Sequence, residues 1–504
     1  MSTTVTRVAT KQARGAEAGK NSKGPQRRER WPWLPFVDLS LAAALVPGFF
    51  LGGLLAAAAR NGSSLLEVYP ALAQAHGHAQ LAGWGGAMIL GVALQFLPRL
   101  RGSQLARPGW IPPLFWTYAA GLALRVAGQV LAALVQATAA GAPGAPGLPG
   151  AAGHGLPFPV QIGLAAFALG AVLEAAAGTG LVIMLGLSLR AGPPLSTKKA
   201  FGQVAPLLAI AFGSFAVSLI AWAAGAVVAA GSVTAAGSPP GTAAAPASAR
   251  LPVIPPALDR LALEIALFGF IAGISLAMSA RVFSLFFRVS PADPRLLRWT
   301  GILLGTGVLV GALAGAIHLA TGSRPPALTG AAAVLWGAAM LTGTAAVHVF
   351  TRRLSFPGDR GRYAWWRDPA GAGAVGAYVW ATLAGLILVL QGLQAWGVRL
   401  GAGPAPADLA IHATGAGFMT LLILAVAPTM LPGFGGGRLR GPGWVWAAVV
   451  LGFLAASLRS APGIASLLGM TAVAWGASAM ALGGVSGLLA VGALIIALRQ
   501  SWRA

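Results

Sequence analysis

Twelve long apolar runs constrain this chain more than any other feature of its sequence. Most of them are 18 to 30 residues long, and a helix of about 20 apolar residues crosses the ~30 Å hydrocarbon core of a bilayer. Charged residues make up only 9% of the 504 residues, whereas soluble domains carry about a quarter. The sequence therefore predicts an all-α polytopic membrane protein whose main partner is the lipid bilayer.

The runs also predict the domain organisation. We expect a disordered basic tail over residues 1–33, one transmembrane domain over 34–500, and flexible outer loops at 137–158 and 232–256, which are rich in Ala, Gly and Pro. The last run is too long for one straight helix, which suggests a break near Gly483 and Gly484. The twelve expected spans are 36–59, 79–97, 111–136, 160–189, 203–231, 257–288, 297–320, 326–351, 372–398, 409–431, 442–458 and 464–498.

The net charge of +23 fits membrane topology better than nucleic-acid binding, because Lys and Arg lie in the short gaps between apolar runs and form no basic face. With the N-terminus inside, 26 Lys and Arg residues fall on the cytoplasmic side and 6 on the outer side. This asymmetry predicts a bacterial inner-membrane protein with both termini in the cytoplasm. Cysteine is absent, which excludes disulfides and thiolate metal ligands.

Spans two and ten begin with similar sequences. Without gaps, 78–98 and 412–432 share an initial His-Ala, a Gly followed by an aromatic residue, Ile-Leu-x-Val-Ala, and Leu-Pro. Span six is a fainter copy that starts at Glu264 and has Gly-Phe at the same offset. Because these matches recur every four spans, we expect three pseudo-repeats of four helices.

This topology places His76, His78, Glu264, His318 and His412 at one level near the outer face, on four helices. Imidazole is a common ligand of haem iron and copper, so His78 and His412 are candidate axial ligands of a haem. His76 is a candidate ligand of a second metal, and His318 with Glu264 could form part of a copper or non-haem iron site. The alternative is that these histidines simply lie among the lipid headgroups.

Arg125 and Glu174 lie in the middle of spans three and four. Ionisable groups at this depth are functional candidates. An ion pair between the two adjacent helices is one interpretation. The functional alternatives are a carboxylate in a proton path and an arginine that faces haem propionates.

Three groups of four spans, with histidines on helices two, seven and ten, resemble subunit I of the haem-copper oxidases and nitric oxide reductases. In that superfamily helices two and ten supply the low-spin haem ligands, which would correspond to His78 and His412. Its copper-binding histidines lie on helices six and seven, where this chain has Glu264 and a single His318.

The chain also resembles the NnrS family of bacterial membrane proteins over most of its length. The similar features are the His-x-His of His76 and His78, the Gly-rich run after His412, and the end of helix six at 281–286. Gln80 stands where that family has Glu. The resemblance implies a haem- and copper-containing protein linked to nitric oxide metabolism, with no settled reaction.

Three functional hypotheses follow. The first is an NnrS-type haem protein, with copper as a second metal, in nitric oxide response or membrane redox chemistry. The second is a haem-copper-type catalytic subunit that takes electrons from a redox partner or a quinol. The third is a secondary transporter that uses the buried Arg125 and Glu174.

Overall fold

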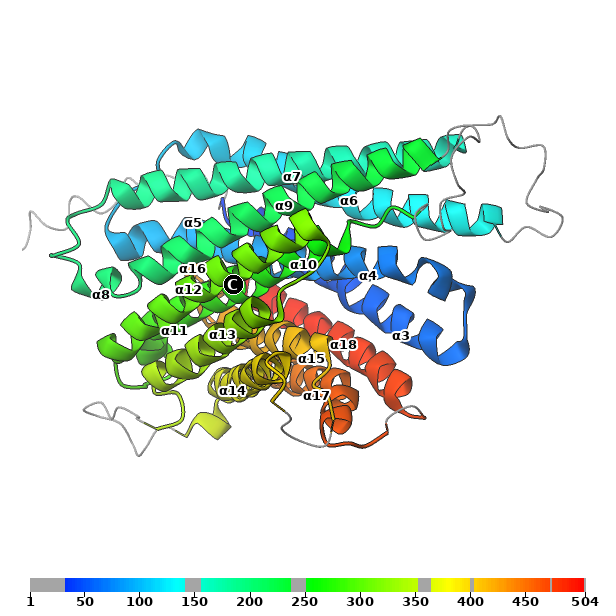
Figure 1. Ribbon diagram of the computed structural model, residues 1–504. Coiled ribbons are helices and arrows are strands. Elements are labelled where there is room, and N and C mark those ends of the chain that lie inside the picture. The colour runs from blue at the N-terminus through cyan, green and yellow to red at the C-terminus, as the bar shows by residue number, and fades with distance from the viewer. Residues whose placement is uncertain are drawn as a thin grey trace, which may run out of the picture. The chain divides into compact units, whose positions relative to one another are not determined.

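The computed structural model describes residues 32–140, 156–236, 251–351, 364–398, 403–471 and 474–502 (Figure 1). Over these residues the chain is helical and contains no β-strand. Twelve helices are long and apolar enough to cross a membrane. The predicted fold class and number of spans are therefore confirmed.

The spans form three consecutive units of four. Unit one contains α2 (Leu34–Ala43), η1 (Ala44–Phe50) and α3 (Leu51–Asn61); η2 (Ser64–Val68), α4 (Tyr69–His78), η3 (Ala79–Ala87) and α5 (Met88–Arg101); η4 (Pro108–Trp110) and α6 (Ile111–Ala140); and α7 (Phe158–Arg190). Unit two contains α8 (Lys199–Gly202) and α9 (Ala205–Ala236); α10 (Pro256–Glu264), η6 (Ile265–Ile271) and α11 (Ala272–Phe286); α12 (Pro294–Thr321); and α13 (Pro326–Val347). Unit three contains η7 (Trp365–Arg367) and α14 (Pro369–Ala395); α15 (Ala407–His412), η8 (Ala413–Met419) and α16 (Thr420–Phe434); α17 (Pro442–Leu467); and α18 (Gly476–Trp502).

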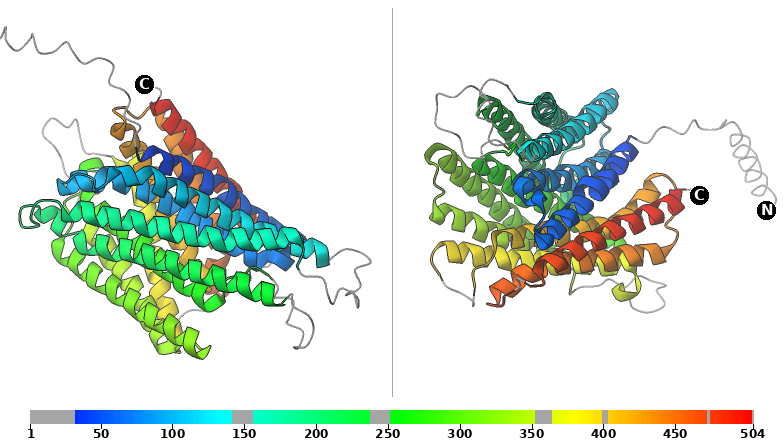
Figure 2. Two further views of the ribbon diagram at one scale, coloured as in Figure 1. Left: turned by 90° about the horizontal axis from the view of Figure 1, so that it is seen from above. Right: turned by 90° about the vertical axis from the view of Figure 1, so that its right-hand side faces the viewer.

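The second span of each unit lies inside the bundle. In spans two, six and ten, 78%, 83% and 61% of the residues in the most apolar window are buried, against at most 56% in any other span. The remaining spans surround these three inner helices. Successive units meet through α7 with α9 and α13 with α14, and α18 packs beside α3 to close the ring (Figure 2).

Each inner helix contains a π-helical segment at the same place in its unit. The segments η3, η6 and η8 directly follow His78, Glu264 and His412, and each contacts the other two. The repeated glycine inside each segment packs against the first span of its own unit: Gly83 on Ala43, Gly269 on Ser214, and Gly417 on Trp380. The weak sequence repeat therefore corresponds to a threefold repeat in space.

Two predicted boundaries differ from the structure. Helices α6 and α9 continue to Ala140 and Ala236, so the connections 137–158 and 232–256 both begin within helix. Residues 141–155 and 237–250 lie outside the described residues.

At the N-terminal end Trp33 is fully buried and packs edge-on against Phe434, so the folded domain includes this residue of the predicted tail.

The predicted break near Gly483 and Gly484 is wrong. Helix α17 extends to Leu467, α18 begins at Gly476, and both glycines lie inside α18. A Cβ at Gly484 would lie 2.5 Å from the Cα of Gly53. Gly484 therefore allows α18 to pack closely on α3, and Gly483 faces Ala455 of α17 in the same way, as small residues do between membrane helices.

We expect the repeated glycines to tolerate no side chain. Gly83→Ala and Gly417→Ala each place a methyl group about 2.5 Å from neighbouring carbons, and overpacking of this kind costs about 1–3 kcal/mol. Each variant should lower the melting temperature of the protein in detergent. Gly213→Ala is the matched control, because nothing lies within 4 Å of a Cβ there. Equal melting temperatures for all three variants would contradict this packing.

Candidate functional site

Three histidines line one cavity of about 360 Å³ near the start of spans two and ten. They are His76 and His78 from α4 and His412 from α15, and we call this space the imidazole cavity. Its volume falls in the range of small-molecule sites, about 300–1,000 Å³. Several of its wall residues are glycines, from spans one, two, ten and twelve: Gly52, Gly53, Gly77, Gly415, Gly483 and Gly484.

A kink in span one orients His76. Pro47 lies in the π-helical η1, and Gly48 has a non-helical ψ of −105°. The Nδ1 atom of His76 lies 2.9 Å from the carbonyl oxygen of Gly48. Because a carbonyl oxygen only accepts, Nδ1 carries the proton and donates it. Nε2 is then the basic nitrogen, and it has no hydrogen-bond partner among the described residues.

His412 has the same arrangement. Its Nδ1 donates to the carbonyl oxygen of Asp408, one helical turn earlier, at 2.9 Å. The carboxylate of Asp408 accepts from Arg459 at 2.9 Å, and Arg459 also lines the cavity. Metal-binding histidines characteristically donate their other ring nitrogen to a carbonyl or carboxylate, which fixes the tautomer. His76 and His412 are both held in this way.

His78 is held differently. Its Nε2 lies 2.7 Å from Oε2 of Glu174, and Nη1 of Arg125 lies 3.8 Å from the same oxygen. All three side chains are buried. The predicted pairing of Arg125 with Glu174 is therefore present, and His78 completes a three-helix contact.

Trp222 extends this group toward span six. Its ring stands edge-on to His78, with centroids 4.8 Å apart, and lies under the Arg125 guanidinium at 5.4 Å. Its Nε1 donates to Asp259 at 3.1 Å. We call His78, Arg125, Glu174, Trp222 and Asp259 the polar cluster.

Glu264 and His318 are not brought together with the three cavity histidines. Arg324 donates to both carboxylate oxygens of Glu264, with Nη1–Oε1 at 3.0 Å, and Arg260 donates to Oε1 at 3.0 Å. A metal at Glu264 would have to displace these arginines. No group of three or more His, Asp or Glu side chains with metal-binding geometry occurs in the part of the chain that the structure describes. A copper or iron site at these two residues stays a prediction.

Sequence reasoning missed Trp222, Asp259 and Arg459. Asp259 lies five residues before Glu264, within the run predicted as span six, and this intramembrane acid was a usable signal. Arg459 was counted only as a topology marker. Trp222 carried no signal, because an aromatic residue in an apolar span is usual.

No protein-family model matches this chain, and no curated protein matches its sequence.

We expect the stability of the protein to depend on Glu174, which pairs with Arg125 in the polar cluster. Glu174→Leu leaves the buried Arg125 guanidinium without its partner, and removing one member of a buried ion pair costs about 3–5 kcal/mol. The variant should show a large fall in melting temperature in detergent. Combining it with Arg125→Leu should recover much of the loss, because no lone charge then remains buried. Glu67→Leu is the control at an exposed acid. A single variant as stable as this control would contradict the pairing.

Proposed function

We propose that this chain is an integral membrane haem protein of the NnrS type, which binds haem in the imidazole cavity and acts in membrane redox chemistry or nitric oxide response. The observation that carries the proposal is the pair His76 and His412. Each donates its Nδ1 proton to a backbone carbonyl and leaves Nε2 free beside one cavity.

The residues around the cavity fit such a group. Two of the wall glycines face open space: a Cβ at Gly77 would meet nothing within 4 Å, and one at Gly415 would meet only Leu267 at 3.9 Å. Arg459 supplies a cation at the same wall, which suits a carboxylate such as a haem propionate. We propose His76 in place of His78 as the partner of His412, because His76 and His412 both leave Nε2 unpartnered, whereas His78 contacts Glu174 through Nε2 and leaves Nδ1 without a partner among the described residues.

In this proposal the haem supplies one-electron chemistry when bound. The chain would hold the iron by two imidazoles, from His76 and His412, between the helices that line the cavity. The polar cluster lies against the same cavity through His78 and Asp259, and it fixes the end of α4 that carries His76. Electrons would come from a redox partner or a quinol.

The haem-copper oxidase type is the second candidate. The observation that favours it is the threefold arrangement of four-span units around inner helices two, six and ten. Turnover of oxygen or nitric oxide by the purified chain with an electron donor would distinguish this candidate from the first.

The test of haem binding is the optical spectrum of the purified protein. We expect a reduced-minus-oxidised haem band that is lost in His76→Ala and in His412→Ala. His348→Ala is the matched control, because His348 lies at the C-terminal end of α13, where its Nδ1 contacts the carbonyl oxygen of Pro291. Metal analysis of the same samples counts iron and copper.

Three outcomes would change the assignment. A colourless, metal-free wild type would rule out haem and copper together. Loss of the band in His78→Ala with retention in His76→Ala would restore the pair His78 and His412. A band that survives all three substitutions would place the haem elsewhere.

We further propose a bacterial inner-membrane location with both termini in the cytoplasm, on the strength of the Lys and Arg asymmetry. Green fluorescent protein fused after the last residue should fluoresce, and alkaline phosphatase fused at the same point should be inactive. Fusions at the 322–325 connection should behave in the opposite way. The reverse pattern would invert the topology.

A further inference from the structure

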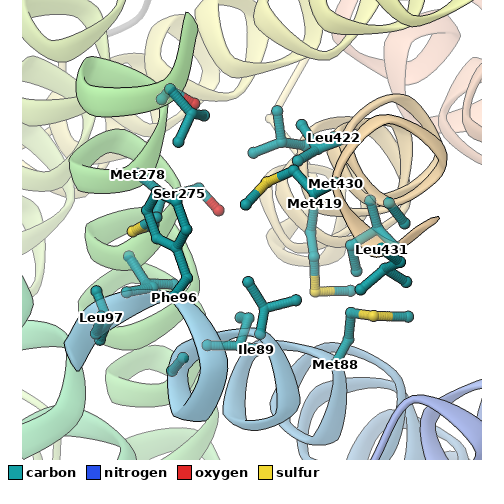
Figure 3. Close-up of a pocket in the computed structure, with 18 of the residues that line it drawn as sticks. Met88, Ile89, Phe96, Leu97, Ser275, Met278, Met419, Leu422, Met430 and Leu431 are labelled. Atoms are coloured by element: carbon teal, nitrogen blue, oxygen red, sulfur yellow. The ribbon is translucent and has the colours of Figure 1, made fainter. Parts of the chain in front are cut away.

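Helix α5 runs between two environments of opposite character. Along its length, Phe96 and Leu97 help to line an apolar cavity among the inner helices, whose lining contains no charged side chain (Figure 3). The last turn of α5 and the short connection that follows it carry Arg99, Arg101 and Arg107. Positive charge is therefore absent from the inner cavity and collects where α5 reaches the end of the bundle.

The connection after α7 carries more positive charge. Helix α8 lies within this connection, at the left-hand end of the bundle in Figure 1. None of the 11 acidic residues of the chain lies in 99–110 or in 190–204. The two segments together contain six cations, which we call the basic junction: Arg99, Arg101, Arg107, Arg190, Lys198 and Lys199.

Hydrogen bonds join the two connections. Nε and Nη2 of Arg101 donate to the carbonyl oxygens of Leu189 and Gly192, at 3.1 and 3.3 Å. The backbone N–H of Ala106 donates to Oγ of Ser188 at 2.8 Å. These contacts attach the connection after α5 to the end of α7, so the two basic connections form one surface.

Lys198 lies against the end of α5. A Cβ at Gly102 would lie 3.2 Å from Cε and 3.3 Å from Nζ of Lys198. Gly102 directly follows the buried Arg101, whose guanidinium lies over the ring of Phe201 at 5.4 Å. No ion pair among the described residues includes a cation of the basic junction. Two cations therefore lie close together with no carboxylate between them, and an anion from outside the chain would lower their mutual repulsion.

The equivalent connection of unit two contains an acid. Between α11 and α12, Asp293 lies between Arg288 and Arg295 in the sequence, and its Oδ1 accepts from the backbone N–H of Arg295 at 2.8 Å. In unit one Arg107 precedes η4 and provides no side-chain cap. Unit two therefore balances part of its positive charge within the chain, and unit one does not.

Apolar side chains border the basic junction. Leu187, in the last turn of α7, and Leu195, three residues before Lys198, are both exposed. Trp110 is also exposed, and the guanidinium of Arg107 lies over its ring at 5.1 Å. Cations beside exposed aliphatic and aromatic side chains are typical of the membrane interface, where basic groups meet lipid phosphates and apolar groups meet acyl chains.

We propose that the basic junction is a binding site for one anionic phospholipid, held by its headgroup phosphate. The ammonium groups of Lys198 and Lys199 donate to the phosphate oxygens, and the buried Arg101 adds its charge from behind. The acyl chains lie against Leu187 and Leu195. A zwitterionic lipid carries its own cation and gains less from this surface. The inference goes beyond the proposed function and does not depend on haem.

Native mass spectrometry of the intact protein, released from detergent, tests this site. Dioleoylphosphatidylglycerol is the probe, and dioleoylphosphatidylcholine, with the same acyl chains, is the comparison. We expect the wild type to retain one phosphatidylglycerol more tightly than phosphatidylcholine. Lys198→Gln combined with Lys199→Gln should weaken the binding of phosphatidylglycerol by about 25-fold, because each lysine near anionic lipid contributes about a factor of five.

Arg438→Gln combined with Arg440→Gln is the matched control. Both arginines are exposed in the connection between α16 and α17, at the same end of the spans, so the net charge falls by the same amount. This variant should bind phosphatidylglycerol as the wild type does. Lys198→Arg combined with Lys199→Arg keeps both charges and should also bind, which separates loss of charge from misfolding.

Three results would overturn the proposal. Equal weakening in the control and in the lysine variant would mean that overall charge attracts the lipid. Equal retention of phosphatidylcholine would remove the role of the headgroup charge. Displacement of the lipid by an excess of inorganic phosphate, at constant ionic strength, would identify a free-anion site. The readout is separate from the optical spectrum, so haem binding and lipid binding can fail independently.

Discussion

Backbone polar groups inside a bilayer must find partners within the protein, because hydrocarbon offers none. Span one departs from regular helix at Pro47, and the kink turns the Gly48 carbonyl toward span two. That carbonyl accepts from the backbone N–H of Leu51 and from Nδ1 of His76. Nδ1 of His412 likewise donates to the carbonyl of Asp408. In both places this hydrogen bond fixes which ring nitrogen carries the proton, so the proposed chemistry depends on the packing of the spans.

The sequence predicts the spans well because apolar length is a local property of the chain. It also located the three π-helical segments indirectly, since the recurring Gly-aromatic pairs at Gly83, Gly269 and Gly417 lie inside them. It did not predict the π-helical geometry of these segments, which lie where the three inner helices contact one another. The boundary between α17 and α18 was missed because residues 468–475, which connect the two helices in the sequence, are themselves mostly apolar.

For the site, the sequence identified residue types and depth but not partners. Of the five residues grouped by level, His76, His78 and His412 line one cavity, and Glu264 and His318 do not. The choice between His76 and His78 depends on the contact of His78 with Glu174, and these two residues are 96 positions apart in the sequence. No repeat or spacing encodes that contact. Glu264 shows the same limit, because the arginine that occupies both of its oxygens, Arg324, comes from the connection after α12.

The arrangement of the inner helices also bears on the proposed choice between a resident cofactor and alternating access. Secondary transporters commonly place the substrate between two repeats that rock against each other, at helices broken near the bilayer midplane. Here η3, η6 and η8 occupy equivalent places in three units and contact one another, so no two halves meet across a central site. Movement of one unit would disturb both of the others. A centre braced from three sides suits a group that stays in place.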